Sequence, residues 1–184
     1  MRLPSVLSES DLPLPELCAA RLDGQLFRLD HAFTPVDEIE QPRHRAHALR
    51  AGLSERLIAE QLSAAWIWGA VDAPPSPHQF CVALDARVGR ARPPWMLVRE
   101  VVIDEHDVVE FGSALVTSRL RTAVDLARFA SSFDPTVIQR LGVDPGEAVA
   151  EIERRRNLPG KKRALARLSR ELPRAELPAA EWVE

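Results

Sequence analysis

The chain has 184 residues, of which 46% are hydrophobic and 28% are charged, and its formal net charge at pH 7 is -3. This composition is typical of a globular protein, and the length allows one compact domain with a hydrophobic core and a small additional unit. The sequence has no apolar run near the ~18 residues that a membrane-spanning helix needs, and its acidic N-terminal stretch does not resemble a signal peptide. We therefore expect a cytoplasmic protein that does not bind a membrane.

The charges are distributed unevenly along the chain. Residues 1–42 hold three basic against eight acidic residues, whereas residues 147–174 hold nine basic against four acidic ones. Such an asymmetry bears on partners and solubility rather than on the fold. The two cysteines, Cys18 and Cys81, are too few for a disulfide scaffold or a four-thiolate metal site, and we expect both to be reduced.

The N-terminal part is predicted to form a helix and a hairpin. The helix ends at about Leu22, a turn follows at Asp23 and Gly24, and the two strands cover residues 25–29 and 32–36. A helix followed by a hairpin is the last part of a winged-helix unit, but the prolines before the helix break any longer helix there. Residues 1–42 are thus predicted to be a truncated, vestigial winged-helix-like piece with its wing hairpin.

Residues 43–70 have a helical composition that is interrupted near Gly52. In the second half, apolar residues recur at the spacing of one buried helix face, and this set comprises Leu57, Ile58, Leu62, Ala65 and Trp66. Because Trp66 and Trp68 are two positions apart, they point in different directions on one helix. One should lie in the core and the other could contact a strand or a partner, but core packing of both is the favoured interpretation.

The next segment is rich in valine, leucine and aromatic residues and is predicted to form strands. They cover residues 78–84, 94–103, 107–111 and 114–117, separated by turn residues, and are expected to pair in a small, mainly antiparallel sheet. The polar residues 104–107 between two of these strands could bind a cation, but turn chemistry alone selects such a sequence. We interpret them as a turn.

Four helices are predicted after the last strand. One starts after Thr117, the next two start after Asp134-Pro135 and Asp144-Pro145, where the acidic residue caps the helix and proline takes its first position, and the last covers residues 160–172. The predicted fold class is α+β, with the truncated N-terminal piece, the sheet and a C-terminal helical cluster. The corresponding domain boundaries are 1–42, 43–172 and a flexible tail at 173–184.

No residue pattern supports a catalytic, cofactor or metal site. His44 and His47 lie one helical turn apart, which suits a metal, but without a third ligand we interpret them as part of a solvated basic helix face. Ser63 lacks the glycine turn of a nucleophile. An enzyme would need a pocket that joins Asp125 to other carboxylates or histidines, and the sequence has no such spacing.

The stretch TSRLRTAVDLAR, residues 117–128, is interpreted as a structural motif at a helix start. Thr117 or Ser118 can cap the helix, and Thr122 and Asp125 lie one turn apart, at hydrogen-bonding distance. Arg121 and Arg128 flank Asp125 at the spacings that allow ion pairs. Capping and local pairing therefore account for this motif, which comprises Thr117, Arg121, Thr122, Asp125 and Arg128.

The C-terminal basic residues are the strongest electrostatic feature of the chain. They are the candidate residues for binding a partner or nucleic acid, namely Arg154, Arg155, Arg156, Lys161, Lys162, Arg163 and Arg167. Nucleic acid, an acidic protein partner and a solvated surface each explain such a cluster. No aromatic residue alternates with these charges, which disfavours a platform that stacks single-stranded bases.

The order of these features resembles the AbiEi-type antitoxin and regulator family of actinobacteria. The counterparts of the family motifs are Ser63–Ala65, Thr117–Ala127 and Lys161–Leu172, and Thr117–Ala127 is the most specific of them. A similar central region occurs upstream of endonuclease domains of the very-short-patch-repair type. The chain departs from the family pattern at Arg119, where the motif usually has proline, and in its incomplete winged helix.

The resemblance implies a non-enzymatic, antitoxin-like protein of a type IV toxin-antitoxin system. Its partner would be a nucleotidyltransferase-like toxin, with the basic C-terminal helices as the contact surface. The alternative is a transcriptional regulator that binds nucleic acid through the same helices. The nuclease activity of the longer relatives is expected to be absent, because the chain ends about a dozen residues after the basic helix.

Overall fold

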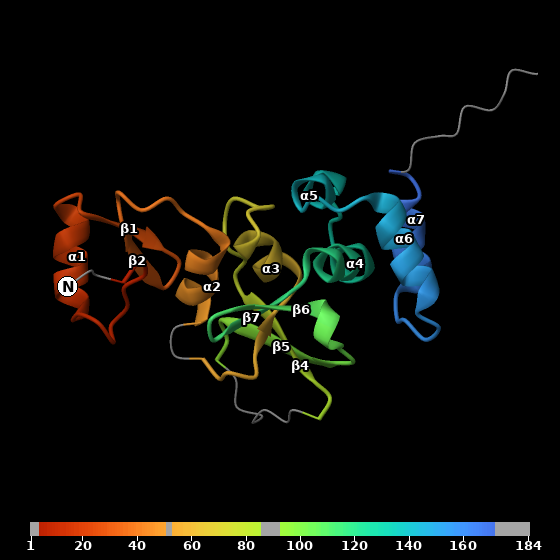
Figure 1. Cartoon of the computed structure of the whole chain (residues 1–184), viewed down its shortest axis with the longest axis horizontal. Helices are drawn as coiled ribbons and strands as arrows, with labels where there is room; N and C mark the ends of the chain where they lie inside the picture. Colours follow the sequence, from red (N-terminus) through yellow and green to blue (C-terminus); the bar gives the residue numbers. More distant parts are fainter. Residues whose placement is uncertain (1–3, 51–52, 86–92, 172–184) are drawn as a thin grey trace, which may run out of the picture.

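The computed structural model describes residues 4–50, 53–85 and 93–171 of the chain. Within these ranges it contains seven α-helices, a five-stranded sheet and a two-stranded hairpin, which confirms the α+β class. The elements follow one another along the long axis of the molecule (Figure 1): the hairpin unit lies at one end, the sheet in the middle and the last helices at the other end. The predicted tail, 173–184, lies outside the described residues.

The N-terminal unit consists of α1 (Leu14–Leu22), β1 (Leu26–Leu29) and β2 (Ala32–Pro35), as the sequence predicts. The strands are antiparallel, and a small core of its own joins this unit to Leu7, which precedes it; the buried members are Leu7, Leu17, Leu26 and Phe33. Leu29 and Ala32 of the hairpin belong to the larger core of the sheet. The helix and the hairpin are thus confirmed. Their origin in a winged helix stays a prediction.

One predicted helix is wrong at its start. Residues Ile58–Ala59 form a short strand, β3, between α2 (Pro42–Arg50) and α3 (Gln61–Ile67). Both strand residues are buried and pair with neighbours on either side, β4 and β7. A short apolar run fits a buried strand as well as a helix face, so the periodicity alone could not distinguish the two.

The sheet is mixed rather than mainly antiparallel. Its strands are β3, β4 (His78–Ala83), β5 (Met96–Val101), β6 (Val108–Phe111) and β7 (Ala114–Thr117), arranged in the order β5-β4-β3-β7-β6. The β3–β4 and β6–β7 pairs are antiparallel, whereas β4–β5 and β3–β7 are parallel. Because β3 lies at the centre, strands that are neighbours in the sequence are not all joined as hairpins.

The C-terminal helices are α4 (Arg119–Phe129), α5 (Pro135–Arg140), α6 (Pro145–Arg154) and α7 (Lys161–Leu168). Their predicted caps are present: the side chains of Ser118, Asp134 and Asp144 each accept a hydrogen bond from a backbone N–H in the first turn. These helix starts are confirmed. The last helix ends at Leu168, which is earlier than predicted.

Within the described residues, the protein has two larger hydrophobic cores. One lies between the sheet, α2 and α3, and the other is formed by the helices α4, α5, α6 and α7. Trp68 and Val71, which follow α3, pack against both cores. Trp66 is fully in the first core. The indole N–H of Trp68 donates to the Thr117 carbonyl at 2.9 Å, and the Arg119 guanidinium lies 4.7 Å from the Trp68 ring. The core position of Trp66 is thus confirmed, whereas Trp68 is only partly buried and contacts the end of β7.

No helix within the described ranges is long and apolar enough to cross a membrane.

Candidate functional site

The site begins at the first turn of α4. The hydroxyl oxygens of Thr117 and Thr122 lie 2.7 Å apart, and the Thr122 hydroxyl is also within 3.1 Å of the Thr117 carbonyl oxygen. The sequence suggested that Thr122 would bond to Asp125, but its hydroxyl faces back toward the end of β7 instead. This pair fixes the turn from strand to helix, next to the capping hydroxyl of Ser118.

Asp125 is the centre of a buried ion-pair network. Arg121 Nε donates to its Oδ2 at 2.9 Å, and Arg128 Nη1 donates to its Oδ1 at 2.6 Å. Asp125 is 0% exposed, and both arginines are buried. The predicted local pairing is confirmed, but it lies in the interior of the protein rather than on a solvated helix face.

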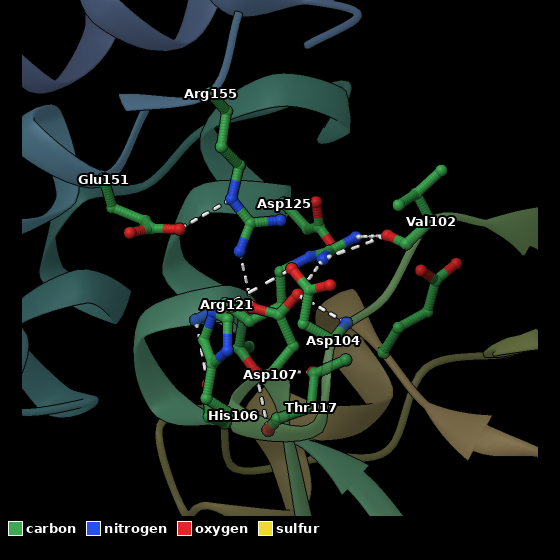
Figure 2. A network of polar contacts seen from close by, with 12 residues as sticks. Val102, Asp104, His106, Asp107, Thr117, Arg121, Asp125, Glu151 and Arg155 are labelled. Carbon is green, nitrogen blue, oxygen red and sulfur yellow. Dashed lines mark hydrogen bonds and ion pairs between the residues drawn. The ribbon is translucent and has the colours of Figure 1, made fainter. Parts of the chain in front are cut away.

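The network continues from α4 to two other elements through Asp107, as Figure 2 shows. Asp107 ends the one-turn 3-10 helix η1 (Glu105–Asp107), and its two carboxylate oxygens accept from Arg121 Nη1 at 2.5 Å and from Arg155 Nη2 at 2.8 Å. Arg155 Nε also donates to Glu151 at 2.6 Å. The predicted turn at 104–107 is therefore present, and it anchors both α4 and the end of α6.

The charges of this network support one another. Burial by itself would raise the pKa of Asp107, but Arg155 and Arg121 hold this pKa below its ordinary range. Burial would likewise lower the pKa of Arg121. The carboxylates of Asp125 and Asp107 outweigh this effect and keep the pKa of Arg121 above its ordinary range. Asp107 is therefore an anion at neutral pH and Arg121 a cation, held in place by hydrogen bonds between charged groups.

A pocket of about 590 Å³, here called the arginine pocket, lies beside this network between the end of β5, α4 and the segment after α6. The ring of Phe129 contacts two guanidinium groups in it, with Arg99 at 4.1 Å and Arg128 at 4.4 Å from the ring centre. Arg99 is fixed from behind by buried Glu60, whose two oxygens accept its Nε and Nη2 at 2.7 and 2.6 Å.

The arginine pocket also has an apolar wall. Leu84, Val102, Leu158 and Pro159 line it, and the side chains of Leu84 and Val102 are among the large exposed hydrophobic ones of the protein. They adjoin β5, which is an edge strand of the sheet. The pocket therefore offers apolar surface next to paired guanidinium groups.

No family model matches the chain. No curated protein matches its sequence. Among solved structures, the chain is similar to the crystal structure of the RV2827C protein from Mycobacterium tuberculosis, at 15% sequence identity and a TM-score of 0.40, over 90% of this chain and 76% of that chain.

Several of the basic residues that the sequence marked as binding candidates have structural partners instead. Arg154 and Arg155 both pair with Glu151. Lys161 Nζ donates to two backbone carbonyls, those of Glu153 and Arg155. Arg167 likewise donates to the carbonyls of Ala127 and Ala130 at the end of α4. Lys161 thus joins α7 to the end of α6 and Arg167 joins α7 to α4, whereas the pair of Arg154 with Glu151 lies within α6.

Three of the seven candidates, Arg156, Lys162 and Arg163, are exposed and have no hydrogen-bond or ion-pair partner within the described part of the chain. Lys162 and Arg163 line a second pocket of about 630 Å³, which adjoins the arginine pocket and shares Arg128, Phe129 and Leu158 with it. These three side chains are the ones available to an anionic partner.

Sequence reasoning missed the residues that shape the arginine pocket. Arg99 interrupts an apolar strand and Glu60 stands between β3 and α3, so each is a charged residue in an otherwise apolar context. That context is a signal that such a residue needs a buried partner. Which partner it finds depends on the order of the strands, which the sequence did not predict.

The remaining sequence candidates are structural. His44 is buried, so its assignment to a solvated helix face is wrong: α2 packs this side against the core, and burial together with Arg43 lowers the pKa of His44. The Nε2 atom of His47 instead lies 3.0 Å from the Phe111 carbonyl oxygen. The Ser63 hydroxyl accepts a hydrogen bond from the backbone N–H of Gln79 at 2.8 Å.

Proposed function

We propose that this protein is a non-catalytic interaction protein that binds a protein partner through the arginine pocket. The observation that carries this proposal is the combination, in one pocket, of the Phe129 ring in contact with two guanidinium groups and an exposed apolar wall. Aromatic rings and arginines in a partly apolar, concave surface are typical of the centre of protein interfaces. The resemblance to AbiEi-type antitoxins names the partner class, a nucleotidyltransferase-like toxin.

The charges of the pocket favour a protein segment over a phosphate backbone. Glu100 and Asp104 also line it, and they would repel phosphates. All five arginines that line it already pair with carboxylates of this chain, namely Arg99, Arg121, Arg128, Arg154 and Arg155. A partner segment with apolar side chains and an occasional carboxylate fits such a mixed surface better than a uniformly negative ligand.

The position of Asp125 supports a role without catalysis. Its carboxylate is fully buried, both of its oxygens are bound by arginines, and it does not line the pocket. A general base must reach the proton that it removes. Asp125 is therefore better suited to hold Arg121 and Arg128 in place than to react.

Binding to the product of a neighbouring nucleotidyltransferase-like gene tests the proposal. The tagged full chain is mixed with this protein, and the dissociation constant is measured by biolayer interferometry. Val102→Glu places a charge on the apolar pocket wall, where the side chain is 68% exposed, and should weaken binding about tenfold or more.

Leu97→Glu is the matched control, because Leu97 is 53% exposed on β5, the strand that Val102 directly follows, and does not line the pocket. It should leave the dissociation constant unchanged. Equal losses in both variants, or no binding by the unaltered chain, would rule the proposed interface out.

The alternative proposal is nucleic-acid binding, and the three unpaired cations of α7 and its preceding loop favour it. In this case the charge-reversed variant Lys162→Glu/Arg163→Glu loses most duplex DNA binding, and the affinity of the unaltered chain falls steeply with salt. Fluorescence anisotropy with labelled duplex at two salt concentrations distinguishes the two proposals. Binding that does not depend on salt would contradict the alternative.

A further inference from the structure

We propose that Asp30, His31 and His78 form a binding site for a divalent cation, with Zn²⁺ as the metal that fits the ligands best. The site is distinct from the arginine pocket. Asp30 and His31 form the turn between β1 and β2, whereas His78 is the first residue of β4. A bound cation would therefore tie the N-terminal hairpin to the central sheet.

The three side chains already lie at the separations of metal ligands. One oxygen of Asp30 is 3.2 Å from His78 Nε2, the other is 4.0 Å from His31 Nε2, and one ligand atom of each residue lies within 4.8 Å of the others. Zinc binds nitrogen and oxygen at about 2.0–2.1 Å in a tetrahedron, so its ligand atoms are about 3.3 Å apart. The separation of Asp30 and His78 matches this value, and small side-chain rotations bring in His31.

Two buried polar atoms of the cluster, Asp30 Oδ2 and His78 Nδ1, have no hydrogen-bond partner in the part of the chain that the structure describes. Asp30 Oδ2 is buried and accepts no hydrogen bond from the described residues, although His78 Nε2 is only 3.2 Å away. The imidazole N–H is therefore not directed at this oxygen. Asp30 Oδ2 and His78 Nε2 are thus in contact without a hydrogen bond between them, so both can bind the same cation. A buried carboxylate oxygen without a partner destabilises the fold, and a bound cation would remove this cost.

The surroundings resemble those of an open metal site. The side chains of His78 and Asp30 are 5% and 9% exposed, whereas that of His31 is 48% exposed and leaves one side open to solvent. The Trp95 ring packs against both imidazoles, at 5.5 Å from His31 and 6.3 Å from His78. Three protein ligands, an apolar wall and a free side for water are the composition of an open zinc site.

The backbone of the turn also directs Asp30 toward this position. Asp30 has a φ of 53°, in the left-handed region that aspartate tolerates in tight hairpin turns. Arg28 Nε donates to the Asp30 carbonyl oxygen at 2.9 Å, which holds the turn in this form. The turn conformation thus positions the residue whose carboxylate enters the cluster.

A second group of similar composition serves as a contrast. Asp104, His106 and Asp107 also bring three possible ligand atoms together. However, both oxygens of Asp107 are occupied by Arg121 and Arg155, and these guanidinium groups repel a cation. The buried carboxylate therefore has arginine partners in the Asp104 group, whereas a buried carboxylate oxygen in the Asp30 group has no hydrogen-bond partner among the described residues.

Isothermal titration calorimetry of the full chain with Zn²⁺, after treatment with a chelator, tests the proposal. The unaltered chain should bind one ion, and His31→Ala, which removes an exposed ligand without disturbing the core, should weaken the affinity about tenfold or more. His106→Ala is the matched control and should bind as the unaltered chain does. Co²⁺ in place of Zn²⁺ should give the visible absorption of a tetrahedral nitrogen and oxygen site, and His31→Ala should abolish it.

A second measurement does not depend on the calorimetric heat. Saturating Zn²⁺ should raise the thermal unfolding midpoint of the unaltered chain and of His106→Ala, but much less that of His31→Ala. Circular dichroism without metal verifies that the variants are folded. The proposal is overturned if the unaltered chain does not bind Zn²⁺, if His31→Ala binds it equally well, or if both variants lose affinity alike.

Discussion

At the scale of single residues, the most consequential feature is the pairing of Asp125 with Arg121 and Arg128. All three side chains are buried, so none can find water if its partner is removed. A buried charge that loses its partner costs far more than an exposed one, because the desolvation of the remaining charge is no longer compensated. These ion pairs of Asp125 should therefore be essential for the stability of the fold, whatever the neighbouring pocket binds.

We predict that Asp125→Ala lowers the free energy of unfolding by about 3–5 kcal/mol, since it leaves buried Arg128 without a carboxylate partner and Arg121 with that of Asp107 alone. Urea denaturation followed by circular dichroism measures this change. The control is Arg154→Ala, which removes a 62% exposed partner of Glu151 and should cost no more than about 1 kcal/mol. Similar losses in the two variants would contradict a special role for the buried network.

At the scale of secondary-structure elements, the connection from α6 to α7 is set by a close approach to α4. Gly160 precedes α7 with a φ of 78°, and a Cβ at this position would lie 3.3 Å from both the Cβ and the carbonyl oxygen of Arg128. Glycine is needed here for two reasons, the left-handed backbone and the short contact. The same close approach places the α6–α7 connection beside both pockets.

We predict that Gly160→Ala is more destabilising than Gly24→Ala. Gly24 has a similar φ of 72°, but nothing lies within 4 Å of its added Cβ. The left-handed backbone costs each variant about 1–2 kcal/mol, and crowding against Arg128 adds about 1–3 kcal/mol for Gly160→Ala alone. Urea denaturation measures the free energy of unfolding of both variants. Equal values would show that Arg128 moves away from the added Cβ at position 160 without an energetic cost.

At the scale of the whole molecule, Asp107 joins parts that are far apart in the sequence. It connects η1 with α4 through Arg121 and with the end of α6 through Arg155. Glu151 extends this connection, and Arg154 and Arg155 hold its pKa below the ordinary value although burial opposes the shift. Two carboxylates with lowered pKa values thus support the packing of the helical cluster against the sheet.

We predict that the protein loses stability in acid. Because the folded-state pKa of Asp107 lies below its ordinary value of 3.8, its contribution is complete above about pH 4 to 5. The contribution declines below 3.8 and is lost as the pH falls through the folded-state pKa. Urea denaturation between pH 6 and pH 2 measures this loss, and Asp107→Asn should show a smaller pH dependence than the unaltered chain. Equal pH dependence in both would exclude Asp107 as a source of it.

The sequence by itself determined the local features of this protein. The caps at Ser118, Asp134 and Asp144, the hairpin after α1 and the ion pairs of Asp125 all follow from residues that are neighbours along the chain. Their physical cause acts within one or two turns of the backbone, where the spacing of residues already specifies the geometry.

Only the tertiary structure decided which distant residues meet. The pairs Glu60–Arg99 and Asp107–Arg155 are separated by 39 and 48 residues, and the cluster of Asp30, His31 and His78 joins a hairpin turn to a strand far along the chain. These contacts depend on the two-residue strand β3, which takes the centre of the sheet and sets the order of its neighbours. A strand that short has no periodicity to recognise, because its partners on both sides, rather than its own residues, make it a strand.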